Sequence, residues 1–140
     1  MKDDGTLRTS STGANRNSAI DKINYEGINS PIVDKVYGEY LHKHRILPNG
    51  DIRSNDNWQK LFGNYAEHKQ ICMESACRHQ LDWRLEHRKQ LQTNEKVKEL
   101  YTSRDGMIEA ICGLIFNAKA YLYAYLLGEE ENRIKEEVKW

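Results

Sequence analysis

The chain has 140 residues, and its 21 Lys and Arg balance 21 Asp and Glu, so the formal net charge is zero. This length suits one domain, and a neutral chain lacks the basic excess needed to bind a long nucleic-acid backbone. The N-terminus has no apolar stretch of the kind found in a signal peptide. Asn117 and Lys119 interrupt the longest apolar run, so we do not expect a membrane span.

The chain has three cysteines, an odd number, and none of them forms a CxxC motif. This argues against a disulfide framework and against a zinc site. A reducing compartment, the cytoplasm, is the expected location.

Residues 1–30 form a polar arm rich in Ser, Thr, Asn, Gly and charged residues. Such a segment has too few hydrophobic side chains to form a packed core. We expect the arm to be disordered, or to become ordered only against a partner.

The first helix is expected to begin after this arm. Ser30 and Pro31 are a typical N-cap and first helical residue. Apolar residues from Ile32 onward follow helical spacing, and this pattern predicts a helix that ends near His44.

The middle of the chain predicts a loop and a long helix. Residues 48–57 read as a polar loop, after which a short helix begins at Trp58. Apolar spacing predicts a longer helix over 65–91, and the polar residues 92–104 are expected to hold a short helical turn.

The last helix is the most hydrophobic segment. It is expected to begin at Ser103 or Asp105, to run through Leu127 and to end with Gly128 as its C-cap, followed by a solvated helical tail over 129–140. Because its apolar residues face nearly every direction, the helix must be covered on all sides. Few other elements are present to cover it, so a homo-oligomer is expected.

These patterns together predict an all-α fold. It has three main helices plus an extended N-terminal arm, assembled as a homo-oligomer. The expected divisions are an arm over 1–30, a helical domain over 31–128 and a charged tail over 129–140.

Four polar features are candidates for function. In the first, Asn57, Trp58 and Lys60 follow one another closely after the polar loop. Together they offer an amide, a stacking surface and a cation for a phosphate. The alternative is a capped helix start with Trp58 in the core.

The second feature lies on the expected helix 65–91. Glu74, Arg78 and Asp82 share a face at four-residue spacing, and His79 precedes Asp82 by three residues. A carboxylate and a histidine this close can bind a divalent metal or transfer a proton. The alternative is a solvent-facing ladder of ion pairs.

The third feature is a stripe formed by Asp105, Glu109, Gly113 and Asn117 at four-residue intervals on the hydrophobic helix. Burying a carboxylate there needs a partner, and Gly113 leaves room for a ligand or for close helix packing. The alternative pairs Glu109 with a cation from a neighbouring helix.

The fourth feature is the arm, in which Arg16 and Lys22 are cations suited to phosphate oxygens if the arm closes over a pocket. The alternative is a mobile tail. Glycine-rich phosphate loops, GxSxG and HExxH are all absent from the sequence.

Several strings also resemble a known family. They are STGANR, DK-NYEG, SP, EYLHKHR, DNWQK, RH–DW-LEHR and EAICGLIFNA, in this order. They resemble the phage dATP/dGTP diphosphohydrolase N-terminal domain family, related in name to the all-α MazG-like nucleotide pyrophosphohydrolases. Leu61 stands where that family typically has Gly, and the paired acidic motifs of MazG-like enzymes are not clearly present.

The resemblance implies a Mg²⁺- or Mn²⁺-dependent purine deoxynucleoside triphosphate pyrophosphohydrolase in the host cytoplasm. His79 and Glu109 would be catalytic. The implied metal ligands are Glu74, Asp82 and Glu109. The implied nucleotide-binding residues are Arg16, Lys22, Asn57, Trp58, Lys60, Arg78 and Asn117.

Two other functions fit the sequence. A non-catalytic protein that sequesters a nucleotide against host defence is favoured by the excess of cations, amides and aromatic residues over carboxylates. A structural or protein-interaction module would use the charged tail and the arm to contact other chains.

Overall fold

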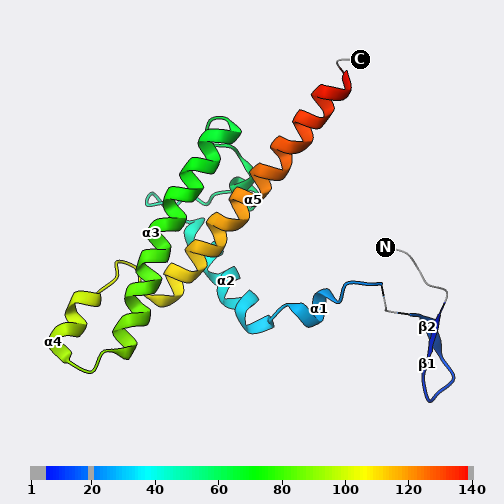
Figure 1. Ribbon diagram of the computed structural model, residues 1–140, viewed down its shortest axis with the longest axis horizontal. Coiled ribbons are helices and arrows are strands. Elements are labelled where there is room, and N and C mark those ends of the chain that lie inside the picture. The colour runs from blue at the N-terminus through cyan, green and yellow to red at the C-terminus, as the bar shows by residue number, and fades with distance from the viewer. Residues whose placement is uncertain (1–5, 19–20, 139–140) are drawn as a thin grey trace. The chain divides into compact units, whose positions relative to one another are not determined.

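The computed structural model describes residues 6–18 and 21–138, and helices dominate it (Figure 1). The fold is therefore mostly α-helical, as the sequence predicts. In chain order the elements are β1 (Leu7–Thr9), β2 (Asn15–Asn17), α1 (Tyr25–Ile28), α2 (Pro31–His44), the 3-10 helix η1 (Asn57–Gln59), α3 (Tyr65–Leu91), α4 (Glu95–Lys98), the 3-10 helix η2 (Glu99–Tyr101) and α5 (Met107–Val138).

The chain divides into two compact units, Met1–Gly38 and Glu39–Trp140. In the first, β1 and β2 form an antiparallel hairpin whose turn contains Gly13 at a φ of 86°. The short helix α1 is capped by the Asn24 side chain, which accepts a hydrogen bond from the Gly27 amide at 2.8 Å. No described residue of this unit is buried.

Helix α2 has the bounds that its sequence predicts. The Ser30 hydroxyl accepts a hydrogen bond from the Val33 amide at 3.4 Å, which caps the helix start. After His44 the chain turns back on itself, and Ile46 forms an antiparallel bridge with Ile52. Gly50 has a φ of 88°, which this tight turn requires.

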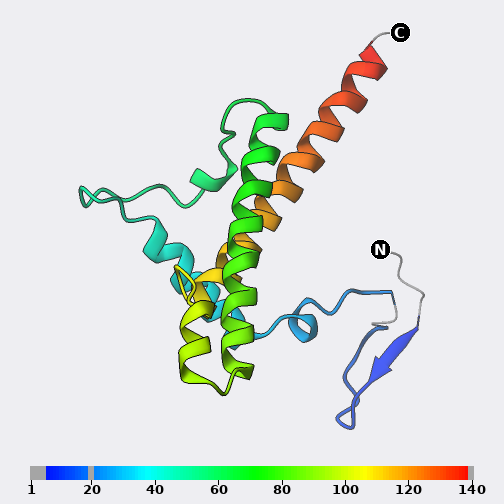
Figure 2. The same cartoon turned by 60° about the vertical axis from the view of Figure 1, so that its left-hand side comes forward.

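The second unit is built around α3 and α5, which run antiparallel and share the most extensive contact between any two elements (Figures 1 and 2). Asn64 caps α3 by accepting a hydrogen bond from the Glu67 amide at 2.9 Å. Small side chains fill the interface between these helices, and no described large side chain is fully buried. The buried hydrophobic residues are Cys72, Ala110, Cys112, Ala120 and Ala124.

All three cysteines are free thiols. Burial raises the pKa of Cys72 and of Cys112, which keeps both thiols protonated and suits small core residues. Cys77 is exposed on α3.

The expected end of the last helix at Gly128 is wrong. Helix α5 continues through Gly128 to Val138, and both views show it running on past the start of α3. The following residues favour a helix, because Arg133 pairs along it with Glu130 and Glu137. The Tyr65 ring also packs beside Gly128.

Helix α5 passes a test of length and composition for a membrane span even though Asn117 and Lys119 lie within it. An 18-residue window of this helix has a mean hydropathy of 1.4. By length and composition alone, the helix is long and apolar enough to cross a bilayer. A core helix of a soluble protein passes the same test of length and composition. One third of that window is buried against the rest of the chain.

Candidate functional site

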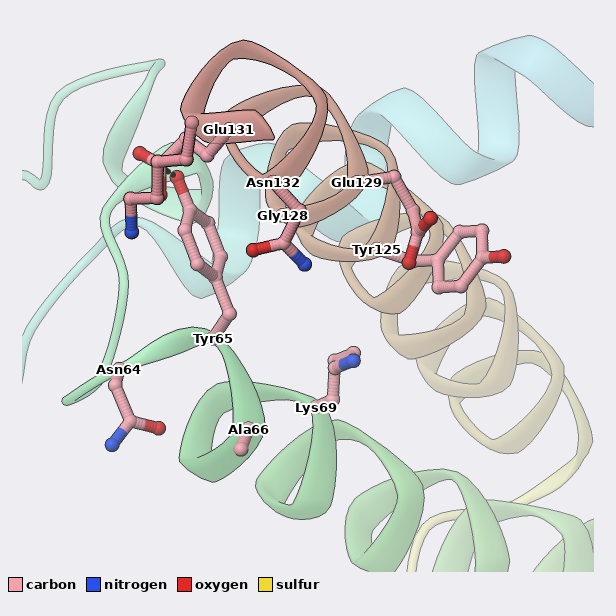
Figure 3. A pocket seen from close by; sticks show the side chains of 10 residues that line it. Asn64, Tyr65, Ala66, Lys69, Tyr125, Gly128, Glu129, Glu131 and Asn132 are labelled. Atoms are coloured by element: carbon pink, nitrogen blue, oxygen red, sulfur yellow. Dashed lines mark hydrogen bonds between the residues drawn. The ribbon is translucent and has the colours of Figure 1, made fainter. Parts of the chain in front are cut away.

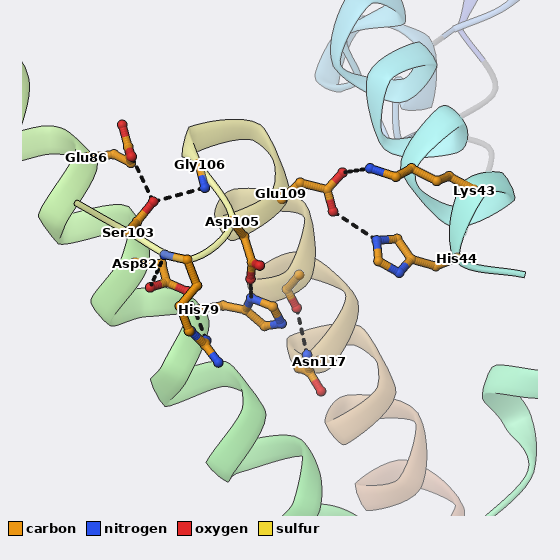
Figure 4. Close-up of polar contacts among 12 residues, drawn as sticks. Lys43, His44, His79, Asp82, Glu86, Ser103, Asp105, Gly106, Glu109 and Asn117 are labelled. Carbon is orange, nitrogen blue, oxygen red and sulfur yellow. Dashed lines mark hydrogen bonds and ion pairs between the residues drawn. The ribbon is translucent and has the colours of Figure 1, made fainter. Parts of the chain in front are cut away.

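A polar cluster lies where the middle of α3 faces the loop before α5 (Figure 4). Helix α3 contributes His79, Asp82 and Glu86, and the loop contributes residues 103–106. The antiparallel arrangement of α3 and α5 brings these two segments, about twenty residues apart in the sequence, into contact.

Asp82 is the buried carboxylate of this cluster, with only 3% of its surface exposed. It accepts hydrogen bonds from the Arg104 guanidinium at 2.9 Å and from the Arg104 amide at 3.4 Å. The pair raises the pKa of Arg104, chiefly through the hydrogen bond. A buried carboxylate needs such a partner. The partner comes from the loop, so Asp82 does not belong to a solvent-facing ladder on α3.

Ser103 fixes the loop that carries Arg104. Its hydroxyl donates to a Glu86 carboxylate oxygen at 2.7 Å and accepts from the Gly106 amide at 2.9 Å. Gly106 has a φ of 84°, a backbone conformation that glycine adopts without strain. These contacts set the direction in which the chain enters α5.

His79 is the least satisfied member of the cluster. Its Nδ1 atom is buried and has no hydrogen-bond partner among the described residues. The nearest carboxylate oxygen, from Asp105, lies 3.9 Å away. A buried nitrogen without a partner is costly, so this atom is a candidate ligand.

The cluster includes one set of potential metal ligands. One ligand atom each from His79, Asp82 and Asp105 lies within 4.8 Å of the other two. Carboxylate oxygens suit Mg²⁺ and Mn²⁺, and an imidazole nitrogen favours Mn²⁺ and later transition ions over Mg²⁺. These three residues are therefore the ones in the cluster that could hold a divalent cation.

Glu109 faces a different set of side chains. It accepts a hydrogen bond from the Lys43 ammonium at 2.8 Å, and its other oxygen lies 2.9 Å from His44 Nε2. The hydrogen bond from Lys43 is the main reason that the pKa of Glu109 lies below its ordinary value. The contact with His44 lowers this pKa further, whereas desolvation raises it. This is the ion-paired alternative that the sequence leaves open for Glu109.

Asn117 is buried on the α3-facing side of α5. Its amide donates to the Gly113 carbonyl oxygen at 2.8 Å, one turn back on its own helix. Its carbonyl oxygen remains the group with which it could recognise a ligand.

The remaining predicted residues of this unit lie outside the cluster. Trp58 packs edge-on against Tyr123 of α5, with ring centroids 4.9 Å apart, while Asn57 and Lys60 are exposed beside it. On α3, Arg78 is exposed, and Glu74 accepts a hydrogen bond from the Gln70 amide at 3.2 Å.

The two predicted cations of the arm belong to the first unit. Arg16 lies in β2 opposite Arg8, and Lys22 lies in the turn before α1. Both residues are exposed.

A second feature, a shallow pocket of about 340 Å³, lies between the start of α3 and the later part of α5 (Figure 3). The Tyr65 hydroxyl donates to Glu131 at 2.9 Å, and this hydrogen bond raises the pKa of Tyr65. The Lys69 ammonium lies 5.7 Å from the centroid of the Tyr125 ring. No sequence motif singles out this pocket, because its residues come from two segments, 64–69 and 125–135, that lie far apart in the sequence.

Arg104, Ser103 and Glu86 are cluster residues that the sequence patterns do not single out. The signal that could have found them is the string Ser103–Gly106, which is polar and directly precedes the most hydrophobic helix. Comparisons with protein-family models, with curated proteins and with solved structures find no match to this chain.

Proposed function

We propose that this protein binds a purine deoxynucleoside triphosphate together with Mg²⁺ or Mn²⁺ and hydrolyses it. The observation that carries the proposal is the convergence of His79, Asp82 and Asp105, in which the buried His79 nitrogen has no hydrogen-bond partner in the described chain. The family resemblance supplies the substrate class, the phage origin and the cytoplasmic location.

Each cluster residue has a role in this proposal. Asp82 and Asp105 supply oxygen ligands and His79 a nitrogen ligand for the cation, which would neutralise phosphate charge. Arg104 donates a hydrogen bond to Asp82. If a cation replaces Arg104 at this carboxylate, the guanidinium becomes free to bind a phosphate oxygen. In the implied reaction, water adds to the α-phosphorus, the bond to the bridging oxygen breaks, and pyrophosphate leaves.

The other predicted residues keep their roles as parts of the proposal. Trp58 would stack on the base, and Asn57 or Asn117 would recognise its edge. Glu109 can reach a cation only if its contacts with Lys43 and His44 open. The remaining proposed ligands are Glu74 for the metal, and Arg16, Lys22, Lys60 and Arg78 for the phosphates. A homo-oligomer and an extended arm complete the proposal.

A second candidate function is sequestration of a nucleotide without turnover. It is favoured by the small number of carboxylates in the cluster, because hydrolysis with two metal ions normally uses several. Among the described residues, Asp82 and Asp105 are the carboxylates that join His79, whereas Glu74 and Glu109 are engaged elsewhere.

The test is to incubate the purified protein with dATP or dGTP and Mn²⁺ or Mg²⁺, and to chromatograph the nucleotides before and after heat denaturation. Monophosphate and pyrophosphate that appear with time, and not with a chelator, support hydrolysis. Intact nucleotide that is lost from solution and returns on heating supports sequestration. Unchanged nucleotide in both samples contradicts both functions.

Matched variants connect either result to the cluster. Asp105→Asn removes one proposed ligand charge, whereas Glu99→Gln changes an exposed carboxylate of η2 that has no role in the proposal. Loss of turnover or of binding in Asp105→Asn alone supports the site. Equal loss in both variants, or in neither, counts against it.

A further inference from the structure

One side of α5 carries a stripe of apolar side chains at alternating spacings of three and four residues. We call it the α5 stripe, and it consists of Ile108, Ile111, Ile115, Ala118, Leu122 and Tyr125. The spacing is that of the a and d positions of a coiled coil.

The α5 stripe lies away from α3. The residues of α5 that are buried follow a second series with the same spacing, which begins at Ala110 and continues through Gly113, Asn117, Ala120 and Ala124. Because each residue turns the helix by about 100°, this series is offset from the stripe by roughly 200°. Helix α3 therefore covers one side of α5 and leaves most of the stripe exposed.

Four positions of the stripe are exposed, namely Ile108, Ala118, Leu122 and Tyr125, whereas Ile111 and Ile115 are partly buried. Ile108 is 60% exposed and Leu122 is 54% exposed, and the adjacent Leu126 is exposed as well. A contiguous apolar surface of this kind is unusual on a monomer and marks an interaction site.

The total surface of the chain is larger than that of a compact protein of its mass. The chain exposes 11238 Å², whereas a folded monomer of 16.4 kDa is expected to expose about 7,500 Å². The exposed N-terminal unit accounts for part of the excess, and the α5 stripe lies in the other unit. A stable homodimer buries roughly 1,000 to 2,500 Å² on each chain, which is less than the excess over the whole chain.

We propose that a second copy of this chain packs antiparallel along the α5 stripe. A two-fold axis near the middle of the stripe would place Ile108 opposite the partner's Tyr125, and Ile111 opposite the partner's Leu122. Ile115 would then face the partner's Ala118. Every layer pairs a stripe residue with another, so the surface is complementary to itself, as a two-fold interface requires.

Charge favours the antiparallel direction. The end of α5 carries five glutamates, at 129, 130, 131, 136 and 137, against Arg133 and Lys135. A parallel pair would bring two such acidic ends together, and it would also place Ala118 against itself, leaving a gap in the seam. The antiparallel pair separates the acidic ends.

This inference specifies the surface of the homo-oligomer proposed above and does not depend on nucleotide binding.

The first test measures the mass of the full chain by size exclusion with light scattering, without nucleotide. The proposal expects about twice 16.4 kDa. The double variant Ile108→Lys with Leu122→Lys is expected to give the monomer mass with unchanged helical circular dichroism, since both side chains are exposed in the single chain. The matched control Leu81→Lys changes a side chain on α3 that is 52% exposed and should remain dimeric.

A second test reads the direction of packing. In a Cys77→Ser background, a mixture of Ile108→Cys and Tyr125→Cys proteins should form a disulfide between unlike chains. Each variant alone should form far less. Preferential linkage between like chains indicates a parallel pair and overturns the proposal.

Three results would overturn the proposal in the mass measurement. They are a monomeric wild-type chain, a double variant with the wild-type mass, and a protein recovered only from membranes with detergent, which would assign the stripe to lipid. The nucleotide assay is independent, so either proposal can fail without the other.

Discussion

The imidazole of His79 lies against Gly113 on the facing helix, where an added Cβ would come within 2.6 Å of His79 Nε2. Contacts this short do not occur between a real Cβ and a ring, so only glycine leaves the ring in place. Gly113 thereby decides where His79 stands relative to Asp82 and Asp105. The glycine that the sequence marks as room for a ligand or for close packing makes room for this ring.

Gly113→Ala is expected to displace the His79 ring and to lower the free energy of unfolding by about 1–3 kcal/mol, the usual cost of overpacking a core. It should also weaken Mn²⁺ binding, because His79 would leave the cluster. Urea unfolding and calorimetric titration with Mn²⁺ measure the two effects.

The matched control is Gly38→Ala, since Gly38 lies within α2 and an added Cβ there meets nothing within 4 Å. This variant should gain about 1 kcal/mol from helix propensity and leave Mn²⁺ binding unchanged. A Gly113→Ala protein with wild-type stability and wild-type Mn²⁺ affinity would show that the ring is not held as described.

Removing Arg104 should expose the cost of burying Asp82. Arg104→Ala leaves a nearly buried carboxylate without its guanidinium partner, and we expect a lower free energy of unfolding, by a modest amount because the arginine itself is largely exposed. A cation bound at Asp82 would replace the missing charge. Mn²⁺ should therefore raise the thermal midpoint of Arg104→Ala more than that of the wild-type protein.

The double variant Arg104→Ala with Asp82→Asn separates the two effects. It should recover part of the lost stability, because no buried charge remains, and it should lose the response to Mn²⁺. If Mn²⁺ stabilises this double variant as strongly as Arg104→Ala, the cation binds elsewhere.

Local sequence signals predict the helices better than the contacts between them. The bounds of α2 and α3 follow from apolar spacing and from caps such as Ser30 and Asn64, which act within one turn. The hairpin of β1 and β2 escapes prediction because each strand has three exposed and mainly polar residues. Its turn depends on backbone hydrogen bonds near Gly13 that have no apolar pattern.

The cluster was predictable only in part, for a physical reason. His79 and Asp82 are neighbours on one helix, so their spacing alone brings them together. Their remaining partners depend on how α3 and α5 align, and that alignment is set by small core residues rather than by a motif. Glu109 illustrates the limit, since its partners lie more than sixty residues earlier in the chain.

Acid should weaken the contribution of Glu109. Its folded-state pKa is depressed, first by Lys43, so its pairing stabilises the fold above the ordinary carboxyl pKa and is lost as pH falls through the folded-state value. The wild-type chain should therefore be more stable than Glu109→Gln near neutral pH. The difference should shrink as the pH is lowered below about 4.5.

Urea unfolding of both proteins across this pH range measures that difference. Lys43→Gln provides a second reading, since the pKa of Glu109, followed by carbon NMR, should move up toward its ordinary value. A stability difference that does not change with pH would mean that the pairing seen here is not formed in solution.

Gly128→Ala tests whether α5 continues or stops at this position. In a continuous helix, alanine is favoured over glycine, and the added Cβ would make an ordinary contact with the Tyr65 ring at 3.6 Å. We therefore expect a gain of about 0.5–1 kcal/mol in the free energy of unfolding. Had the helix ended there with glycine in the left-handed conformation, as the sequence suggests, alanine would be strained and the sign would reverse. Urea unfolding decides between the two, and helical circular dichroism of a chain shortened at residue 128 reports how much of the helix lies beyond it.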